Sequence, residues 1–190
     1  MEKIKMDVGI PEGMNICSTS EGLKIERKWF SSKTLFLTVF VVFWNGFLFN
    51  WYSNVPDLGS LTKENMMVVL FPLLHVSVGL GLTYYVIASY FNKTTVTVNY
   101  SLLESKISPI PFGFKKSIPS TSIEQVYCKE IVKRTKNGSS VSFEVRVILR
   151  NRSNIRLVSG LKSSEQALFL EHEIESHLGI KDVSVKGELS

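Results

Sequence analysis

The sequence predicts an α+β membrane protein, in which a two-helix transmembrane hairpin is joined to a cytoplasmic antiparallel β-sheet or barrel of about seven strands. A C-terminal helix is expected to close the β-rich part. Charged residues make up 21% of the 190 residues, yet two long segments carry none. After the second of these segments, apolar and polar side chains alternate, which is typical of half-buried strands.

The composition excludes several classes of protein. Two cysteines cannot hold together a disulfide-rich scaffold. The 44% of hydrophobic residues and the full set of aromatic residues exclude global disorder. A formal net charge of +5 is ordinary as an average, so the distribution of the charges is more informative than their sum.

Residues 1–33 are predicted to form a cytoplasmic β-hairpin segment. Two short runs, 14–17 and 23–29, are separated by the polar residues 18–22, and apolar side chains alternate with charged ones in the second run. Because two strands alone are marginal in water, we expect this segment to pair with the other cytoplasmic part of the chain.

Two charge-free segments are predicted to cross the membrane, 34–52 and 66–91, with a short external loop at 53–65. As helices they span about 28 and 39 Å, against about 30 Å for the hydrocarbon core. The second must therefore tilt or kink, and Pro72 is the expected kink. The alternative, a pair of buried core helices, is disfavoured because both segments reach the spanning threshold of about 18 residues. Bulky residues follow the first segment, so we expect a retained span rather than a cleaved signal peptide.

The flanking basic residues predict the topology. The loop between the two spans carries Lys63 as its one basic residue. Six basic residues flank the spans on the other side: Lys24, Arg27, Lys28 and Lys33 before the first span, and Lys93 and Lys106 after the second. By the positive-inside rule, both termini lie in the cytoplasm. We therefore expect a multi-pass protein of the inner (plasma) membrane.

Residues 92–190 are predicted to form the cytoplasmic β domain. The strand-like runs are 94–100, 102–107, 114–118, 123–136, 140–150 and 155–159. Asn137 and Gly138 form the strongest hairpin signal. The pattern then changes to a period of 3.6 over the helix 163–178, which begins with the capping residues Ser163 and Gln166 and ends before Gly179.

Several short motifs carry a resemblance to a known family: EGLKIERKWFS at 21–31, FWNGF at 43–47, NKTTVTV at 92–98, SGL at 159–161, EQALFLE at 165–171 and LGI at 178–180. The chain resembles a family of uncharacterised bacterial two-span membrane proteins with a pleckstrin-homology-like (PH-like) cytoplasmic domain. The resemblance implies a PH-like fold for 92–190. It supplies no catalytic residues, and the zinc-ribbon-like leader of some relatives has only Cys17 as a counterpart here.

The residues that most often perform chemistry form no recognisable set. The two cysteines and three histidines lack the paired spacing of a zinc site: Cys17, Cys128, His75, His172 and His177. No glycine-rich phosphate loop follows a strand. We therefore expect no enzyme activity, no metal and no cofactor.

Polar residues within the predicted spans are candidates for function. Asn45, Asn50 and His75 are candidate intramembrane polar residues, either as a proton- or ion-sensing group or as interhelical hydrogen bonds in packing. Ser77 and Gly81 form a small-xxx-small pair that favours close helix packing, against the first span or against another copy of the chain.

Charge is strongly divided within the β domain. Residues 93–162 carry a net charge of +9, and residues 163–190 carry −4. The candidate contacts for anionic headgroups or a protein partner lie in or beside turns: Lys115, Lys116, Lys133, Arg134 and Lys136. The alternative is that these charges only keep a membrane-adjacent surface solvated. No aromatic stacking platform accompanies them, so no nucleic-acid partner is expected.

Together these patterns predict a non-enzymatic, membrane-tethered interaction or scaffold module. Its partners would be the lipid bilayer, an unidentified protein or a second copy of the chain. The alternative is an accessory subunit of a membrane enzyme or transporter that uses Asn45, Asn50 and His75.

Overall fold

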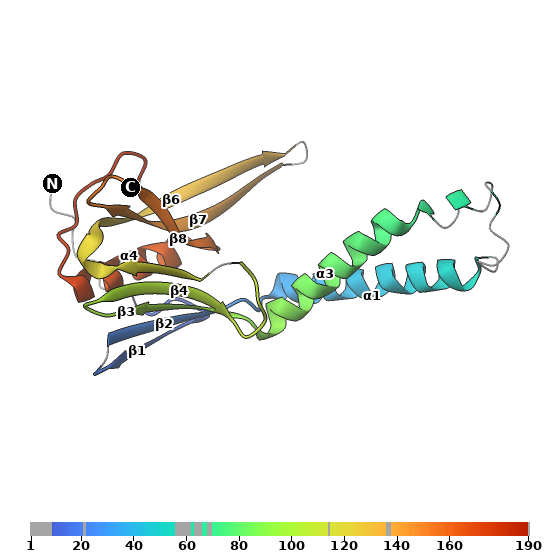
Figure 1. The fold of residues 1–190 in the computed structure, drawn as a ribbon, viewed down its shortest axis with the longest axis horizontal. Coiled ribbons are helices and arrows are strands. Elements are labelled where there is room, and N and C mark those ends of the chain that lie inside the picture. Colours follow the sequence, from blue (N-terminus) through green and yellow to red (C-terminus); the bar gives the residue numbers. More distant parts are fainter. Residues whose placement is uncertain are drawn as a thin grey trace. The chain divides into compact units, whose positions relative to one another are not determined.

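The computed structural model of the protein (Figure 1) describes residues 9–20, 22–55, 62, 66–67, 70–113, 115–135 and 138–189. The chain divides into two compact units. The first, which we name the β domain, contains the chain up to Lys28 and from Lys93 onward. The second, the helix pair, comprises Trp29–Asn92. Most of the predicted external loop 53–65 lies outside the described residues.

The larger sheet of the β domain has five antiparallel strands in sequential order. They are β1 (Met14–Thr19), β2 (Gly22–Lys28), β3 (Lys93–Val98), β4 (Leu102–Ser108) and β5 (Lys116–Pro119). The predicted N-terminal hairpin is present as β1 and β2.

Strand β2 pairs with β3, so segments from both sides of the helix pair form one sheet. Ile25 faces Val96 across this ladder, and Lys28 faces Lys93 at its end. Leu23 and Ile25 are 4% and 1% exposed, because the alternation of β2 turns them toward the core. The N-terminal segment is therefore an integral part of the β domain.

The smaller sheet has three antiparallel strands, β6 (Ile123–Thr135), β7 (Gly138–Leu149) and β8 (Asn154–Leu161). Strand β8 pairs with β7 only between Phe143 and Ile148. Beyond this stretch, β6 and β7 continue as a two-stranded ribbon (Figure 1).

Helix α4 (Ser164–Leu178) begins one residue after the predicted start at 163 and ends at the predicted residue. Ser163 Oγ accepts a hydrogen bond from the backbone N–H of Gln166 at 3.3 Å. Gly179 ends the helix with a φ of 65°. Ala167 and Ile174 are both 0% exposed, since they face the core that the helix shares with both sheets.

The two sheets do not close into a barrel. Within the described residues no backbone ladder joins the two sheets. The sheets contain eight strands rather than the predicted number of about seven, and two of them, β1 and β2, come from the N-terminal segment. The physical reason lies in β5, which has four residues and ends at Pro119, a residue without an N–H donor. The expectation of antiparallel sheets with a closing helix is confirmed, and the barrel alternative is wrong.

The helix pair consists of α1 (Ser32–Ser53) and α3 (Leu73–Phe91). Both helices are long and apolar enough to cross a bilayer. The predicted second span began at residue 66 and was expected to kink at Pro72. Met66, Met67 and Leu70 are helical, and a turn at Phe71 and Pro72 separates them from α3, so the helix is interrupted at the predicted position. A helix of 19 residues measures about 28 Å, so the predicted excess length of the second span is absent from α3.

Candidate functional site

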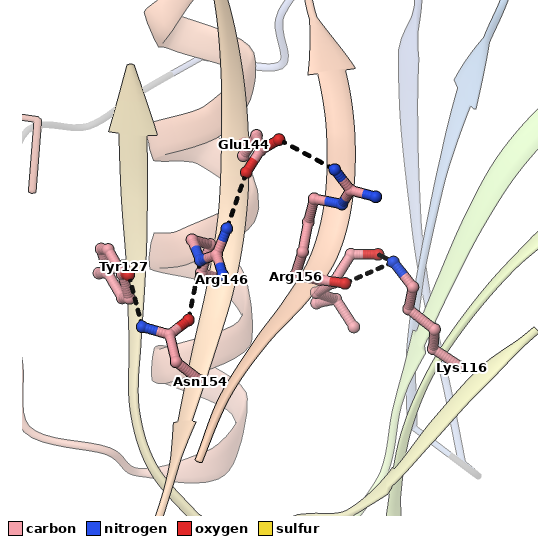
Figure 2. Close-up of polar contacts among 7 residues, drawn as sticks. Lys116, Tyr127, Glu144, Arg146, Asn154 and Arg156 are labelled. Atoms are coloured by element: carbon pink, nitrogen blue, oxygen red, sulfur yellow. Dashed lines mark hydrogen bonds and ion pairs between the residues drawn. The ribbon is translucent and has the colours of Figure 1, made fainter. Parts of the chain in front are cut away.

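The outer face of the smaller sheet carries a network of charged side chains, drawn in Figure 2. Val145 and Val147 point into the core, so the alternate residues Glu144 and Arg146 of β7 point to the opposite face. Arg146 faces Arg156 of β8, and like charges at facing positions are unfavourable. Glu144 offsets this repulsion, because its carboxylate accepts bonds from Arg146 at 3.0 Å and Arg156 at 3.5 Å.

Two neutral side chains extend the network across all three strands. Asn154 Oδ1 accepts a hydrogen bond from Arg146 Nε at 2.8 Å, and Asn154 Nδ2 donates to the Tyr127 hydroxyl at 2.7 Å. These bonds hold Arg146, whose side chain is 25% exposed, whereas that of Arg156 is 55% exposed. Arg156 is therefore the member of the network most accessible to an anion in solution.

Lys116 joins the two sheets through its side chain. Its ammonium donates to the backbone carbonyls of Arg156 and Leu157, the latter at 3.3 Å (Figure 2). Burial is the main cause that lowers the pKa of Lys116, and the nearby Arg156 lowers it further. Arg27 makes a similar tie, since its Nη1 donates to the Gly160 carbonyl at 2.8 Å. The side chains of Lys116 and Arg27 thus bind backbone carbonyls of β8 and join the two sheets where no backbone ladder does.

We predict that replacing Glu144 by alanine lowers the free energy of unfolding by about 1–3 kcal/mol, because Arg146 then loses a partner and faces Arg156 without a counter-charge. Denaturant unfolding of the full chain in detergent measures this. Glu130→Ala, an exposed carboxylate on β6, is the matched control and should change little. Adding Arg156→Ala to Glu144→Ala should restore part of the loss. Equal stabilities for Glu144→Ala and Glu130→Ala would contradict the role of the network.

The structure separates the five predicted contact residues. Lys115 forms an exposed ion pair with Glu104 at 2.7 Å, and its hydrogen bond lowers the pKa of that carboxyl. Lys116 is engaged as described, and Lys136 lies outside the described residues. Lys133 and Arg134 are exposed near the end of β6 and form no hydrogen bond or ion pair within the described part of the chain. These two cations are therefore the ones available to an external anion.

The polar residues of the helix pair are not gathered into one group. Asn45 Nδ2 donates to the Val41 carbonyl at 2.8 Å and to Thr83 Oγ1 of α3 at 3.1 Å. His75 stacks on Trp44 with a centroid distance of 5.7 Å, and Trp44 Nε1 donates to the His75 carbonyl at 3.1 Å. Asn50 is exposed, and among the described residues no contact joins it to His75.

The close approach of the two helices occurs at Gly79. A Cβ atom there would lie 3.2 Å from atoms of Trp44, Asn45 and Leu48, whereas a Cβ at Gly81 would meet nothing within 4 Å. Ser77 is exposed and donates to the Leu73 carbonyl within its own helix. The predicted pair Ser77 and Gly81 thus lies away from the contact with α1.

Sequence reasoning missed Gly79, although one signal in the sequence marks it. Gly79 and Thr83 also form a small-xxx-small pair. In the structure, buried residues recur every seven positions, as in a packed helical seam: Thr34, Val41 and Leu48 on α1, and Gly79 and Val86 on α3, with Pro72 just before α3.

Two further features of the β domain were not predicted. Carboxylate oxygens of Glu171, Asp182 and Glu188 lie within 4.8 Å of one another, a spacing that suits a divalent cation. Each of these residues also takes part in other polar interactions, so no metal role is assigned to them. An open pocket of about 860 Å³ lies at the end of α4, and its lining includes Arg150 and Lys181 together with Glu124.

The described site residues predicted from the sequence are thus divided among α1, α3, β6 and the start of β5. The cationic network of Figure 2 adds Arg146 and Arg156 to them. Neither cysteine suggests a nucleophile paired with a histidine: Cys17 is exposed on β1 and Cys128 is buried in β6. In comparisons with known proteins, no family model and no curated sequence matches the chain.

Proposed function

We propose that the protein is a non-enzymatic, membrane-tethered interaction module. The helix pair is its transmembrane hairpin, and the β domain contacts anionic phosphate headgroups at the cytoplasmic leaflet. The observation that carries the proposal is the surface of the helix pair. Phe36, Phe43 and Phe49 of α1 are 79%, 75% and 78% exposed, and large aromatic side chains spread over a helix in this way suit contact with lipid.

The PH-like assignment of the β domain is part of the proposal. Seven strands, β2 to β8, form two antiparallel sheets and are followed by the closing helix α4. Strand β1 adds to the edge of the first sheet. This arrangement supports a PH-like module into which the helix pair is inserted between the first and second strands.

Charge supports contact with the cytoplasmic leaflet. Lys28 and Lys33 precede or begin the first helix, and Lys93 follows the second, as the positive-inside rule expects for a hairpin with cytoplasmic ends. Each cation close to an anionic leaflet contributes about 1 kcal/mol of attraction. Lys133 and Arg134 on the β domain have no internal counter-charge among the described residues, which favours binding of an external anion over a purely structural role.

Cysteine labelling tests the predicted topology. Cys17 is exposed on β1 and Cys128 is 0% exposed, so a membrane-impermeant maleimide should report on Cys17 alone. We expect labelling in inside-out vesicles and protection in right-side-out vesicles. Labelling from the outside would contradict the cytoplasmic placement, and Cys17→Ser is the matched control.

Hydrogen exchange tests the contact with headgroups. The full chain is placed in nanodiscs of phosphatidylcholine with or without phosphatidylglycerol, at about 0.1 and 0.5 M salt. We expect slower exchange of amides in the β domain in the anionic discs at low salt only, because screening weakens the attraction. The same exchange in both kinds of disc would overturn headgroup binding.

A further inference from the structure

The β6–β7 ribbon extends beyond the rest of the smaller sheet. We name residues 131–135 and 138–142 the ribbon tip. Strand β8 pairs with β7 no further than Phe143, so the ribbon tip has no third strand in the described structure (Figure 1). A two-stranded ribbon alone is marginally stable in water. An external surface that orders this ribbon would therefore stabilise it.

The ribbon tip carries an apolar pair. Val132 faces Val141 across the ladder, and the two side chains are 50% and 47% exposed. Alternation along the strands places them on the same face as Cys128 and Val145, which are fully buried in the core. On this face the exposed Glu130 separates Cys128 from Val132 along β6, whereas the partly buried Phe143 joins Val145 to Val141 along β7. The apolar surface of the core thus continues along β7 past the end of the packed structure and meets solvent.

Two cations follow this pair directly. Lys133 faces Ser140 and Arg134 faces Ser139, so neither has an opposite charge across the ladder. By alternation Arg134 shares the face of Val132, whereas Lys133 lies on the opposite face of the ribbon. As stated above, neither forms an ion pair within the described residues. Apolar side chains flanked by free cations suit the boundary between anionic headgroups and acyl chains, where the cations bind phosphate and the apolar groups enter.

We propose that the ribbon tip is a second, reversible membrane contact of the protein. Val132 and Val141 enter the interface of the bilayer, while Lys133 and Arg134 bind lipid phosphates. This inference rests on the proposed function, because the transmembrane hairpin holds the ribbon at high effective concentration near the lipid. Two valines and two cations bind too weakly to recruit a soluble protein, but suffice for a tethered one.

Site-specific quenching tests the inference. In a Cys17→Ser background, the full chain carries an environment-sensitive fluorophore at Val132→Cys in nanodiscs of phosphatidylcholine with or without phosphatidylglycerol. The matched control carries it at Val183→Cys, an equally apolar side chain that is 58% exposed. In the anionic discs we expect at least twofold stronger quenching by brominated lipids at position 132 than at 183. Lys133→Ala with Arg134→Ala should remove the difference, and Lys181→Ala with Lys186→Ala should not.

The outcomes separate this inference from the proposed function. If position 132 is not quenched while exchange in the β domain still slows in anionic discs, the role of the ribbon is overturned and headgroup binding stands. If neither signal depends on anionic lipid, both are overturned. A fluorophore at 132 that is shielded from water without quenching by lipid indicates that protein covers the ribbon, which also overturns the inference.

Discussion

Replacing Ile25 by alanine is expected to lower the free energy of unfolding of the whole β domain by about 2–5 kcal/mol. Ile25 is 1% exposed and belongs to the core formed by strands and helix α4 of the C-terminal part. It lies in β2, which pairs with β3 although the entire helix pair separates the two strands in sequence. The loss of stability should therefore extend to strands about 100 residues away, such as β6.

Cys128 provides a native probe of this effect. It is 0% exposed in β6, so a thiol reagent reaches it only when the domain opens. In a Cys17→Ser background, a loss of 2 kcal/mol or more corresponds to labelling that is about 30-fold faster or more. Asn15→Ala, on the exposed face of the neighbouring strand β1, is the control and should leave the rate unchanged. Equal rates in both variants would show that the N-terminal segment is not part of the cooperative unit.

This coupling has a simple origin in the topology. The chain leaves the β domain after Lys28 and returns at Lys93, and these residues face each other at the end of one antiparallel ladder. The helix pair thus takes the place of the short turn that ordinarily joins two adjacent strands. Because both connections begin at paired residues, the insertion lengthens the loop without removing a rung of the sheet. Closing a longer loop adds only slowly to the entropic cost.

Local patterns in the sequence predict most of the elements. The alternation at Leu23 and Ile25 and the cap at Ser163 depend on neighbours within four residues, so the sequence alone is sufficient. The sequence predicts that the N-terminal hairpin pairs with the other cytoplasmic part, and the pairing of β2 with β3 confirms this. The partner strand and the register were not predicted, because they depend on the complete core. The interruption before α3 was predicted from Pro72, because proline lacks the N–H that a continuous helix needs, although hydropathy continues through Phe71.

The candidate site was harder to predict for the same reason. Lys115 and Lys133 look alike in the sequence, since both are cations in or beside turns. They differ in the structure, because Glu104 lies beside Lys115 and no carboxylate lies beside Lys133 within the described residues. Likewise, Arg146 and Arg156 become neighbours only through the register of β7 and β8. A charge count finds the basic sheet but not the cations that have no internal partner.

The helix pair offers the other prediction with a large effect. Replacing Gly79 by leucine is expected to destabilise the packing of α1 against α3 by about 1–3 kcal/mol. A Cβ alone would be tight at 3.2 Å from Trp44, Asn45 and Leu48, and leucine adds three further carbons. The change should also break the hydrogen bond from Asn45 to Thr83, since the helices must separate to admit the side chain.

Gly81→Leu is the matched control, because its Cβ meets nothing within 4 Å. Both substitutions replace glycine by leucine in one helix and gain the same helix propensity of about 1 kcal/mol, so their difference isolates packing. Trp44 reports on the contact in a Trp29→Phe, Trp51→Phe background, with the full chain titrated by sodium dodecyl sulfate in mixed micelles. We expect the Trp44 transition at lower detergent fraction for Gly79→Leu than for Gly81→Leu. Coincident transitions would show that Gly79 is not where the helices meet, and a lower transition for Gly81→Leu would move the contact to the opposite face of α3.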